Sequence, residues 1–251
     1  MTNPFTLDGR TALVTGANTG IGQGIAIALA KAGADIVAAG RRSPQETEAA
    51  VLGLGHRFRF IAADLSSTAP IAGMIRETVE NMGRLDILVN NAGMISRADA
   101  LDVAEADWDR VINVDLKSAF FLAQAAARHM AGAGGGKIIN VVSMLSFQGG
   151  IRVPAYTAAK SALAGVTKAL ANEWAQMRIN VNAIAPGYIA TDNTRALRDD
   201  QTRDREITAR IPAGRWGEPK DLGGAAVFLA SAASDYVHGA IIPVDGGWLA
   251  R

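Results

Sequence analysis

The chain of 251 residues contains no cysteine. Without thiols there is no disulfide framework, no cysteine nucleophile and no thiolate zinc site. The three histidines, His56, His129 and His238, are scattered and lack the spacing of metal ligands, so no metal site is expected. No G-x-S-x-G sequence is present either, which weakens a serine-hydrolase interpretation.

The chain also lacks an excess of charge and long apolar runs. Its formal net charge of +1 gives no reason to expect nucleic acid or a membrane surface as a partner. No apolar run approaches the roughly 18 residues that cross a bilayer. Met1–Arg10 has no apolar region typical of a secretory signal. A cytoplasmic protein is therefore expected.

Short apolar or β-branched segments alternate with longer helical patterns along the whole chain. Strands are expected at 11–15, 35–39, 58–62, 87–89, 137–142, 180–185 and 240–244, and helices at 21–32, 68–82, 105–130, 155–175 and 219–231, with a polar helix starting at Pro44. This alternation predicts a doubly wound α/β Rossmann fold, with one parallel sheet and helices on both faces. No linker or repeat divides the sequence, so residues 1–251 are expected to form a single dinucleotide-binding and catalytic domain.

A Gly-rich segment, Thr15–Gly22 (TGANTGIG), follows the first expected strand. Glycines permit a tight turn and a close approach of the backbone to a pyrophosphate, while the next helix offers free N–H groups and a positive dipole end. A plain Gly-rich turn is the alternative, weakened by the position directly after the first strand of a βα series. The cofactor contacts predicted here are Gly16, Asn18, Thr19, Gly20, Ile21 and Gly22.

The second expected strand ends in Gly40-Arg41-Arg42, at the position where an acidic residue would bind the ribose hydroxyls of NAD. Arginine pairs with a 2′-phosphate, which a carboxylate would repel. Arg41 and Arg42 therefore favour NADP(H). If both side chains are merely solvated, NAD(H) is the alternative.

Polar residues follow other expected strands, at the edge where open α/β sheets bind ligands. Asp64 follows the third strand, as a partner of the adenine amino group or as a cap of the next turn. Asn91 and Gly93 follow the fourth, as ligand contacts or as turn formers. The other cofactor contacts predicted along this edge are Leu65, Ala92, Pro186, Gly187, Ile189 and Thr191.

The pair Tyr156 and Lys160 has i, i+4 spacing, which places both side chains on one face of a helix. A neighbouring ammonium stabilises a phenolate, so it lowers the pKa of the tyrosine and makes it a usable general acid or base. Ser143 ends the fifth strand and can face the same crevice to hydrogen-bond a substrate oxygen. A surface Tyr–Lys pair is the ordinary alternative, and the upstream Gly-rich turn argues against it.

These motifs together resemble the short-chain dehydrogenase/reductase family, in its shorter subgroup rather than the longer, epimerase-like one. The resemblance covers essentially the whole chain, from Gly16, Gly20 and Gly22 to Tyr156, Lys160 and Pro186-Gly187. It implies a seven-stranded sheet, a homotetramer and a catalytic set of Asn113, Ser143, Tyr156 and Lys160. In the family, the residue at Asn113 holds a water that links the lysine to a proton relay.

A narrower resemblance covers Ser143–Tyr156, Asn182–Thr194, Arg210–Gly217 and Val244–Arg251. It points to the subfamily of 2-deoxy-D-gluconate 3-dehydrogenases, also described as 2-dehydro-3-deoxy-D-gluconate 5-dehydrogenases, of uronate, pectin or alginate catabolism, a subfamily usually assigned NAD. The predicted substrate residues are Ser143, Gln148, Arg152, Tyr156 and Asn193, whose polar and cationic groups suit a hydroxylated carboxylate. Arg198 is expected on a solvated helix face.

The expected reaction transfers a hydride between a nicotinamide cofactor and a carbonyl or secondary alcohol. Alternative substrates are another small polyol, ketone or 3-ketoacyl compound. A non-catalytic dinucleotide-binding regulator and an epimerase or dehydratase are the rivals from other classes. The apolar end of the chain, Trp248–Arg251, is expected at or near a subunit interface, because an exposed aromatic terminus would be an unfavourable patch.

Overall fold

The computed structural model describes residues 3–251, so the predictions that include Met1 and Thr2 fall partly outside the described residues. Within this range, seven strands form one parallel sheet in the order β3-β2-β1-β4-β5-β6-β7. The strands are β1 (Thr11–Thr15), β2 (Asp35–Gly40), β3 (Phe58–Ala62), β4 (Ile87–Asn90), β5 (Gly136–Val141), β6 (Ile179–Pro186) and β7 (Ile241–Val244). The predicted doubly wound Rossmann sheet is confirmed. Its strand order reverses between β1 and β4, which opens a crevice at their carboxyl ends.

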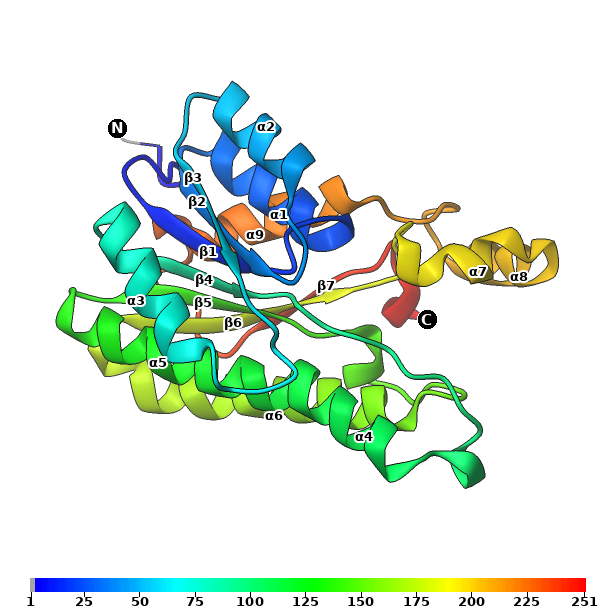
Figure 1. Ribbon diagram of the computed structural model, residues 1–251. Coiled ribbons are helices and arrows are strands. Elements are labelled where there is room, and N and C mark those ends of the chain that lie inside the picture. The colour runs from blue at the N-terminus through cyan, green and yellow to red at the C-terminus, as the bar shows by residue number, and fades with distance from the viewer. Residues whose placement is uncertain (1–2) are drawn as a thin grey trace.

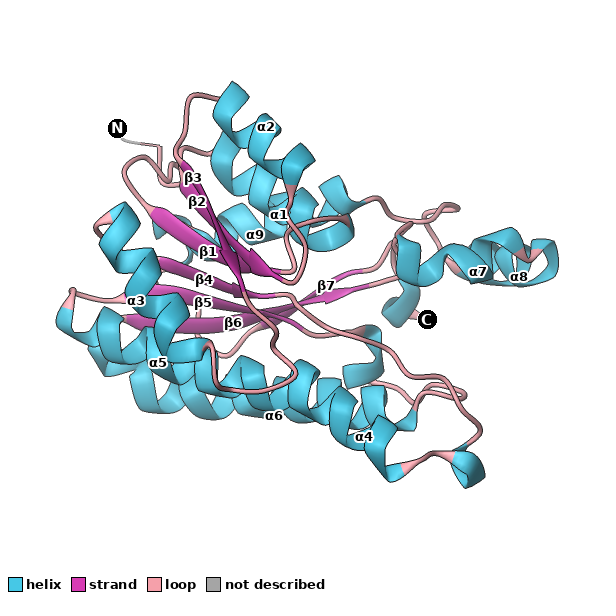
Figure 2. Cartoon of the chain, viewed as in Figure 1, coloured by secondary structure: helices cyan, strands magenta, loops and turns pink. Residues whose placement is uncertain are grey.

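Helices cover both faces of this sheet (Figure 1, Figure 2). One face carries α1 (Gly20–Lys31), α2 (Gln45–Gly53) and α9 (Gly223–Ala230), and the other carries α3 (Ile71–Met82), α4 (Glu105–Ile112), α5 (Ser118–Gly132) and α6 (Pro154–Trp174). Side chains of β1 alternate between two cores: Ala12 and Val14 pack in the cluster of α1 and α9, while Leu13 packs in the cluster of α3 and α5. Burial on both faces explains why the strands read as unbroken apolar runs.

Two features differ from the expected helices. The helix expected over 105–130 is interrupted by a π-helical turn, Asn113–Lys117, between α4 and α5. The helices α7 (Arg195–Asp199) and α8 (Gln201–Arg210) were not among the expected elements. Only Ile207 of α8 is buried, so the segment has no apolar stripe by which a sequence pattern would reveal it. Both helices project beyond the carboxyl edge of the sheet (Figure 1).

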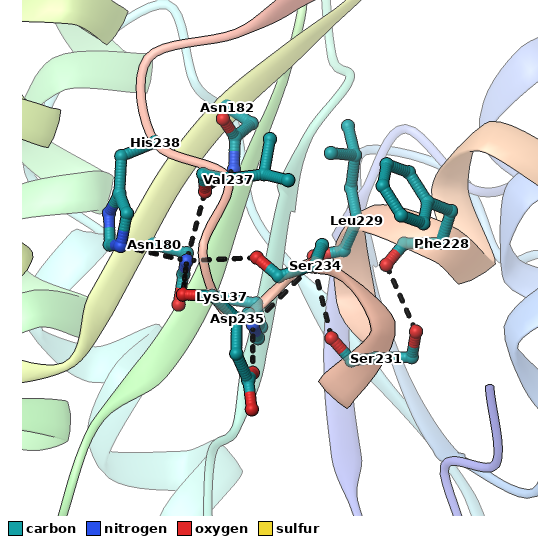
Figure 3. A network of polar contacts seen from close by, with 10 residues as sticks. All are labelled: Lys137, Asn180, Asn182, Phe228, Leu229, Ser231, Ser234, Asp235, Val237 and His238. Atoms are coloured by element: carbon teal, nitrogen blue, oxygen red, sulfur yellow. Dashed lines mark hydrogen bonds and ion pairs between the residues drawn. The ribbon is translucent and has the colours of Figure 1, made fainter. Parts of the chain in front are cut away.

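At the opposite end of the sheet, a polar network anchors the segment that leads into β7 (Figure 3). The Asn180 amide lies 2.9–3.1 Å from the carbonyl oxygens of Ser234, Asp235 and Val237. The Lys137 ammonium pairs with the Asp235 carboxylate at 2.7 Å. Because this network is remote from the crevice, it contributes to the fold rather than to a site. No helix among residues 3–251 is long and apolar enough to cross a membrane.

Candidate active site

The Gly-rich turn connects β1 to α1 at the centre of the carboxyl edge. Gly16 and Gly20 adopt positive φ angles of 67° and 58°, a conformation that L side chains rarely take. At Gly22, an added Cβ would lie 2.3 Å from the Gly16 carbonyl oxygen and 2.4 Å from the Asn91 amide nitrogen. Thr19 caps α1 without a side-chain hydrogen bond, so the first N–H groups of this helix remain available to an anion.

Asn91 braces this turn from the neighbouring strand. Its side-chain amide donates to the carbonyl oxygens of Thr15, at 2.9 Å, and Gly16, at 3.3 Å. The Thr15 hydroxyl accepts the backbone N–H groups of Asn91 and Ala92 at 3.0 and 2.9 Å. The Asn91 side chain therefore connects the end of β4 to the turn after β1.

The residues predicted to select the cofactor lie next to the turn. Gly40 leaves space, since an added Cβ would approach the Gly16 nitrogen no closer than 3.9 Å. Arg41 and Arg42 are exposed. Hydrogen bonds from Ser66 lower the pKa of Asp64, and the charge of Arg41 adds to this effect. Arg41 and Asp64 thus lie near one another at the ends of β2 and β3, and Leu65 is buried.

The segment after β6 lies next to the same turn. Pro186 ends β6 and Gly187 follows it, and Ile189 is buried. A Cβ at Gly20 would lie 3.2 Å from a methyl carbon of Thr191. The cofactor residues predicted from sequence therefore cluster at the carboxyl ends of β1 to β4 and β6.

Ser143, Tyr156 and Lys160 meet where β5 ends and α6 begins. The Ser143 hydroxyl lies close enough to Tyr156 to lower its pKa, and the Lys160 ammonium lies 5.6 Å from the centre of the Tyr156 ring. Lys160 itself is 3% exposed and donates to the Val141 carbonyl oxygen at 2.9 Å. The three side chains that the sequence singled out are thus brought together.

The surroundings of Tyr156 shift its acidity in a direction the sequence did not predict. Burial raises the pKa of Tyr156; the charge of Lys160 opposes this, the charge of Asp115 reinforces it, and the Ser143 hydroxyl and the charge of Arg97 lower the pKa by smaller amounts. The net pKa of Tyr156 is therefore raised. Lys160 acts in the expected direction, but burial of the phenol outweighs it.

Asp115 is a site residue that sequence reasoning missed. It is fully buried in the π-helical turn, 3.2 Å from the Lys160 ammonium, and it accepts the Met94 backbone N–H at 3.0 Å. Asn113 begins the same turn, and its carbonyl oxygen accepts the N–H of Ser118 five residues later. An aspartate between the apolar residues Val114 and Leu116 was the signal available in the sequence.

Arg97 is the second residue that was missed. It lies in the loop after β4, where its charge acts on Tyr156, and its guanidinium donates to the Asn193 carbonyl oxygen at 3.2 Å. Of the predicted substrate residues, Asn193 is thus bound to Arg97 through its backbone carbonyl. Arg152 pairs with Asp99 at 3.0 Å, and Gln148 accepts a hydrogen bond from Trp248 at 3.3 Å.

Two expectations about the C-terminal half are corrected. Trp248 is not an exposed apolar terminus: it is 4% exposed, packs against Tyr188 at 4.8 Å between ring centres and lies beneath Arg210. The reason given for placing this segment at a subunit interface therefore fails. Arg198 is half-buried rather than solvated, and it donates to the Thr191 carbonyl oxygen at 3.1 Å.

A groove and the distribution of His, Asp and Glu side chains were considered as other candidate sites. A groove of about 820 Å³ between α1 and the segment Glu218–Val227 includes none of the predicted site residues. Across residues 3–251, no group of three or more His, Asp or Glu side chains has the arrangement of a metal site. The chemistry of the site is therefore assigned from the carboxyl-edge crevice.

Comparison with known proteins agrees with this geometry. Residues 16–249 match the family described as enoyl-(acyl carrier protein) reductase. The chain is 58% identical, over 99% of both sequences, to 2-dehydro-3-deoxy-D-gluconate 5-dehydrogenase of Dickeya dadantii.

Two solved structures extend the likeness to three dimensions. A structure from Agrobacterium tumefaciens with bound NADP, provisionally assigned as 2-deoxy-D-gluconate 3-dehydrogenase, is 56% identical with a TM-score of 0.92 over 100% of both chains. A short-chain type dehydrogenase/reductase from Mycobacterium marinum is 37% identical with a TM-score of 0.93, over 99% of this chain and 98% of that chain. The fold, the site and these relatives together establish that the chain is an oxidoreductase of the short-chain dehydrogenase/reductase family.

Proposed function

We propose that this enzyme transfers a hydride between NADP(H) and a keto-deoxy sugar acid of the 2-dehydro-3-deoxy-D-gluconate or 2-deoxy-D-gluconate type, in uronate, pectin or alginate catabolism. The observation that carries the proposal is the meeting of Ser143, Tyr156 and Lys160 beside the cationic Arg97. The names of relatives such as the Dickeya dadantii enzyme support the substrate class.

Tyr156 donates a proton to the carbonyl oxygen during reduction and accepts one during oxidation. Ser143, which lies beside Tyr156, stabilises the negative charge that develops on the same oxygen. Lys160 supplies the positive charge that opposes the raised pKa of Tyr156. A phenol is protonated at neutral pH, and this is the form of Tyr156 that serves ketone reduction.

We propose that the dinucleotide binds in this crevice. The positive-φ glycines, the close packing at Gly22 and the uncapped N-terminus of α1 form a cradle that a side chain would fill. The residues proposed to hold the cofactor are those predicted along the carboxyl edge, from Gly16–Gly22 to Thr191, with Tyr156 and Lys160. The bound nicotinamide supplies or accepts the hydride.

The preference for NADP(H) over NAD(H) is proposed from Gly40, Arg41 and Arg42. Gly40 leaves room beside the turn, and the exposed guanidinium groups provide charge for a 2′-phosphate. Arg41 also stands opposite Asp64, whose pKa it helps to lower. This carboxylate accepts a hydrogen bond from Ser66 at 2.9 Å, consistent with its alternative role as a cap of the turn.

Arg97 is the residue proposed to bind the substrate carboxylate. It is exposed, acts electrostatically on Tyr156 and donates to the Asn193 carbonyl oxygen. A guanidinium forms charge-assisted hydrogen bonds to carboxylates. Arg152, proposed earlier for a similar task, is engaged by Asp99 at 3.0 Å, so its contribution to substrate binding is proposed to be smaller.

The test is a spectrophotometric screen that crosses NADPH and NADH with keto-deoxy sugar acids, small polyols, simple ketones and ketoacyl thioesters. The proposal expects the highest kcat/KM with NADPH and 2-dehydro-3-deoxy-D-gluconate or its reduced partner. Faster turnover of an uncharged polyol or a thioester would replace the sugar acid by that substrate. Cofactor binding without turnover of any compound would favour a regulator.

The domain organisation, cellular location and oligomeric state are also proposed. We propose that residues 1–251 act as one domain, that the enzyme is cytoplasmic and that it forms a homotetramer. The half-exposed aromatic rings of Trp108 and Phe121 on α4 and α5 support a partner on that face. Sedimentation at micromolar protein concentration tests the tetramer, and a monomer there would exclude it.

A further inference from the structure

We propose that Asp115 is a positioning residue whose carboxylate locks Lys160 beside Tyr156 and supplies the negative charge that both groups sense. The inference rests on the proposed role of Tyr156 as the proton donor and acceptor. It deepens that role because it names the group that controls when Tyr156 gives up its proton.

The first argument is geometric. The Asp115 carboxylate reaches the Lys160 ammonium at 3.2 Å and is itself held by the Met94 backbone N–H at 3.0 Å. Lys160 has three N–H donors; the Val141 carbonyl oxygen takes one at 2.9 Å and Asp115 faces another. One donor is left for a bound ligand. Two fixed partners thus determine where a long and otherwise flexible side chain lies.

The space for this pair is built into neighbouring elements. A Cβ at Gly93 would lie 2.6 Å from the Asp115 carboxylate and 3.6 Å from the Lys160 nitrogen, so only glycine fits there without displacement. The π-helical turn Asn113–Lys117 carries Asp115 into the interior, and such turns occur often at functional sites. Asp115 and Lys160 are 0% and 3% exposed, so solvent screens their interaction little.

The charges around the pair give the direction of the effect. Tyr156 is faced by Lys160 from its own helix, by Asp115 from the π-helical turn, by Ser143 after β5 and by Arg97 after β4. Lys160 is faced by Asp115 and Tyr156. Burial alone would lower the pKa of Lys160, but Asp115 and Tyr156 together raise it, and Asp115 also raises the pKa of Tyr156.

Removing the negative charge of Asp115 should therefore change the apparent pKa of the Tyr156–Lys160 pair in one direction only. A nearby anion makes a proton harder to remove from either neighbour, so its loss lowers the apparent pKa of the Tyr156–Lys160 pair. Asp115→Asn preserves the shape and an oxygen for the Met94 N–H. We expect a downward shift of roughly one pH unit, near the lower end of what a close charge produces.

The matched control is Asp86→Asn. Asp86 is also a buried carboxylate, 7% exposed, but it pairs with Arg84 and Arg10 at the start of β4, at the opposite end of the sheet.

The first measurement is an ultraviolet titration of tyrosinate without substrate, in which each variant is compared with the same variant carrying Tyr156→Phe. Asp115→Asn is expected to lower the Tyr156 midpoint, and Asp86→Asn to leave it unchanged.

The second measurement is the pH profile of kcat/KM in both directions, with NADP(H) and 2-dehydro-3-deoxy-D-gluconate and its reduced partner. In Asp115→Asn, the rising limb of oxidation and the falling limb of reduction should both move to lower pH by about one unit. A purely structural residue would scale both profiles without moving them. Unchanged limbs and an unchanged titration midpoint would overturn the inference.

Different results would contradict the role of Asp115 and the proposed substrate. A shifted tyrosinate midpoint without turnover of the sugar acid overturns the substrate assignment and supports the role of Asp115. If Asp115→Asn does not fold, Asp115→Ser, which keeps a hydroxyl acceptor, is titrated in its place. Loss of the fold in both variants would show that the carboxylate serves folding, and the inference would be discarded.

Discussion

Replacement of Gly22 by alanine tests whether the crevice is the cofactor site. The new methyl group would lie 2.3 Å from the Gly16 carbonyl oxygen and 2.4 Å from the Asn91 amide nitrogen. Real Cβ atoms do not approach so closely, so the turn and the β4 segment must separate. One of the two hydrogen bonds of Asn91, at 2.9 and 3.3 Å, is then stretched or lost.

The magnitude follows from this geometry. Overpacking a tight contact costs about 1–3 kcal/mol, and a lost hydrogen bond adds about 1 kcal/mol. Because the same atoms form the proposed cradle for the pyrophosphate, we expect the Kd for NADPH to rise at least about tenfold, equivalent to about 1.4 kcal/mol. Urea unfolding measures the stability, and isothermal titration calorimetry measures the Kd.

Two glycines serve as controls. An alanine at Gly24, in the same helix, would place its Cβ 2.5 Å from the Pro219 carbonyl oxygen, outside the cofactor cradle. Gly24→Ala should therefore destabilise the protein without a matching loss of affinity. Gly165 lies in α6 with open space around it, so Gly165→Ala should stabilise by about 1 kcal/mol. Normal NADPH affinity in a folded Gly22→Ala protein would refute the placement of the cofactor.

Four further outcomes are expected. Tyr156→Phe should lower kcat by at least about a hundredfold with little change in the Kd for NADPH; a rate above about a tenth of wild type would exclude Tyr156 as the proton donor. The ratio of kcat/KM for NADPH over NADH should exceed one in the wild type and fall below one in Gly40→Asp; a wild type that prefers NADH would mean that the arginines are solvated. Arg97→Ala should raise KM for the sugar acid about tenfold or more and leave the NADPH Kd unchanged, with partial recovery in Arg97→Lys, and an unchanged KM would assign the carboxylate to another group. Burial raises the pKa of Asp86, but hydrogen bonds from Arg84 and other donors outweigh burial and lower it. Because this carboxyl pKa is lower in the folded than in the unfolded chain, Asp86→Asn should reduce the free energy of unfolding by roughly 2 kcal/mol at neutral pH, and this difference should disappear as the pH falls below about 4. Urea unfolding across pH measures the difference, and any other pH trend would contradict the prediction.

The sequence predicts most of the fold because its signals are local. The unbroken apolar strands, the glycines of Thr15–Gly22 and the i, i+4 spacing of Tyr156 and Lys160 each depend on neighbours a few residues away. Strand ends lie within one or two residues of the expected bounds. Parallel strands bring their carboxyl ends to one edge, so the clustering of Ser143, Tyr156 and the Gly-rich turn also follows from the pattern.

The polar helix α8 escaped this reasoning for a related reason. A sequence pattern reveals a helix through the stripe of apolar residues that it buries. The segment Gln201–Arg210 buries only Ile207, and its start is marked by Asp200, which caps the helix by accepting the N–H groups of Thr202 and Arg203. That cap is visible in the sequence, but a cap alone does not distinguish a helix from a turn.

The electrostatics of the site were decided by tertiary structure alone. Asp115 and Lys160 are 45 positions apart in the sequence, and they meet at 3.2 Å because the π-helical turn carries the carboxylate inward. Arg97 reaches the segment of Asn193 across the crevice, and Trp248 is covered by its own chain. Spacing identifies which side chains share an element, but a pKa depends on burial and on every charge nearby, whichever part of the chain supplies it. For that reason the sequence predicted the Tyr156–Lys160 pair and only the folded chain showed that burial, with Asp115, raises the pKa of its tyrosine.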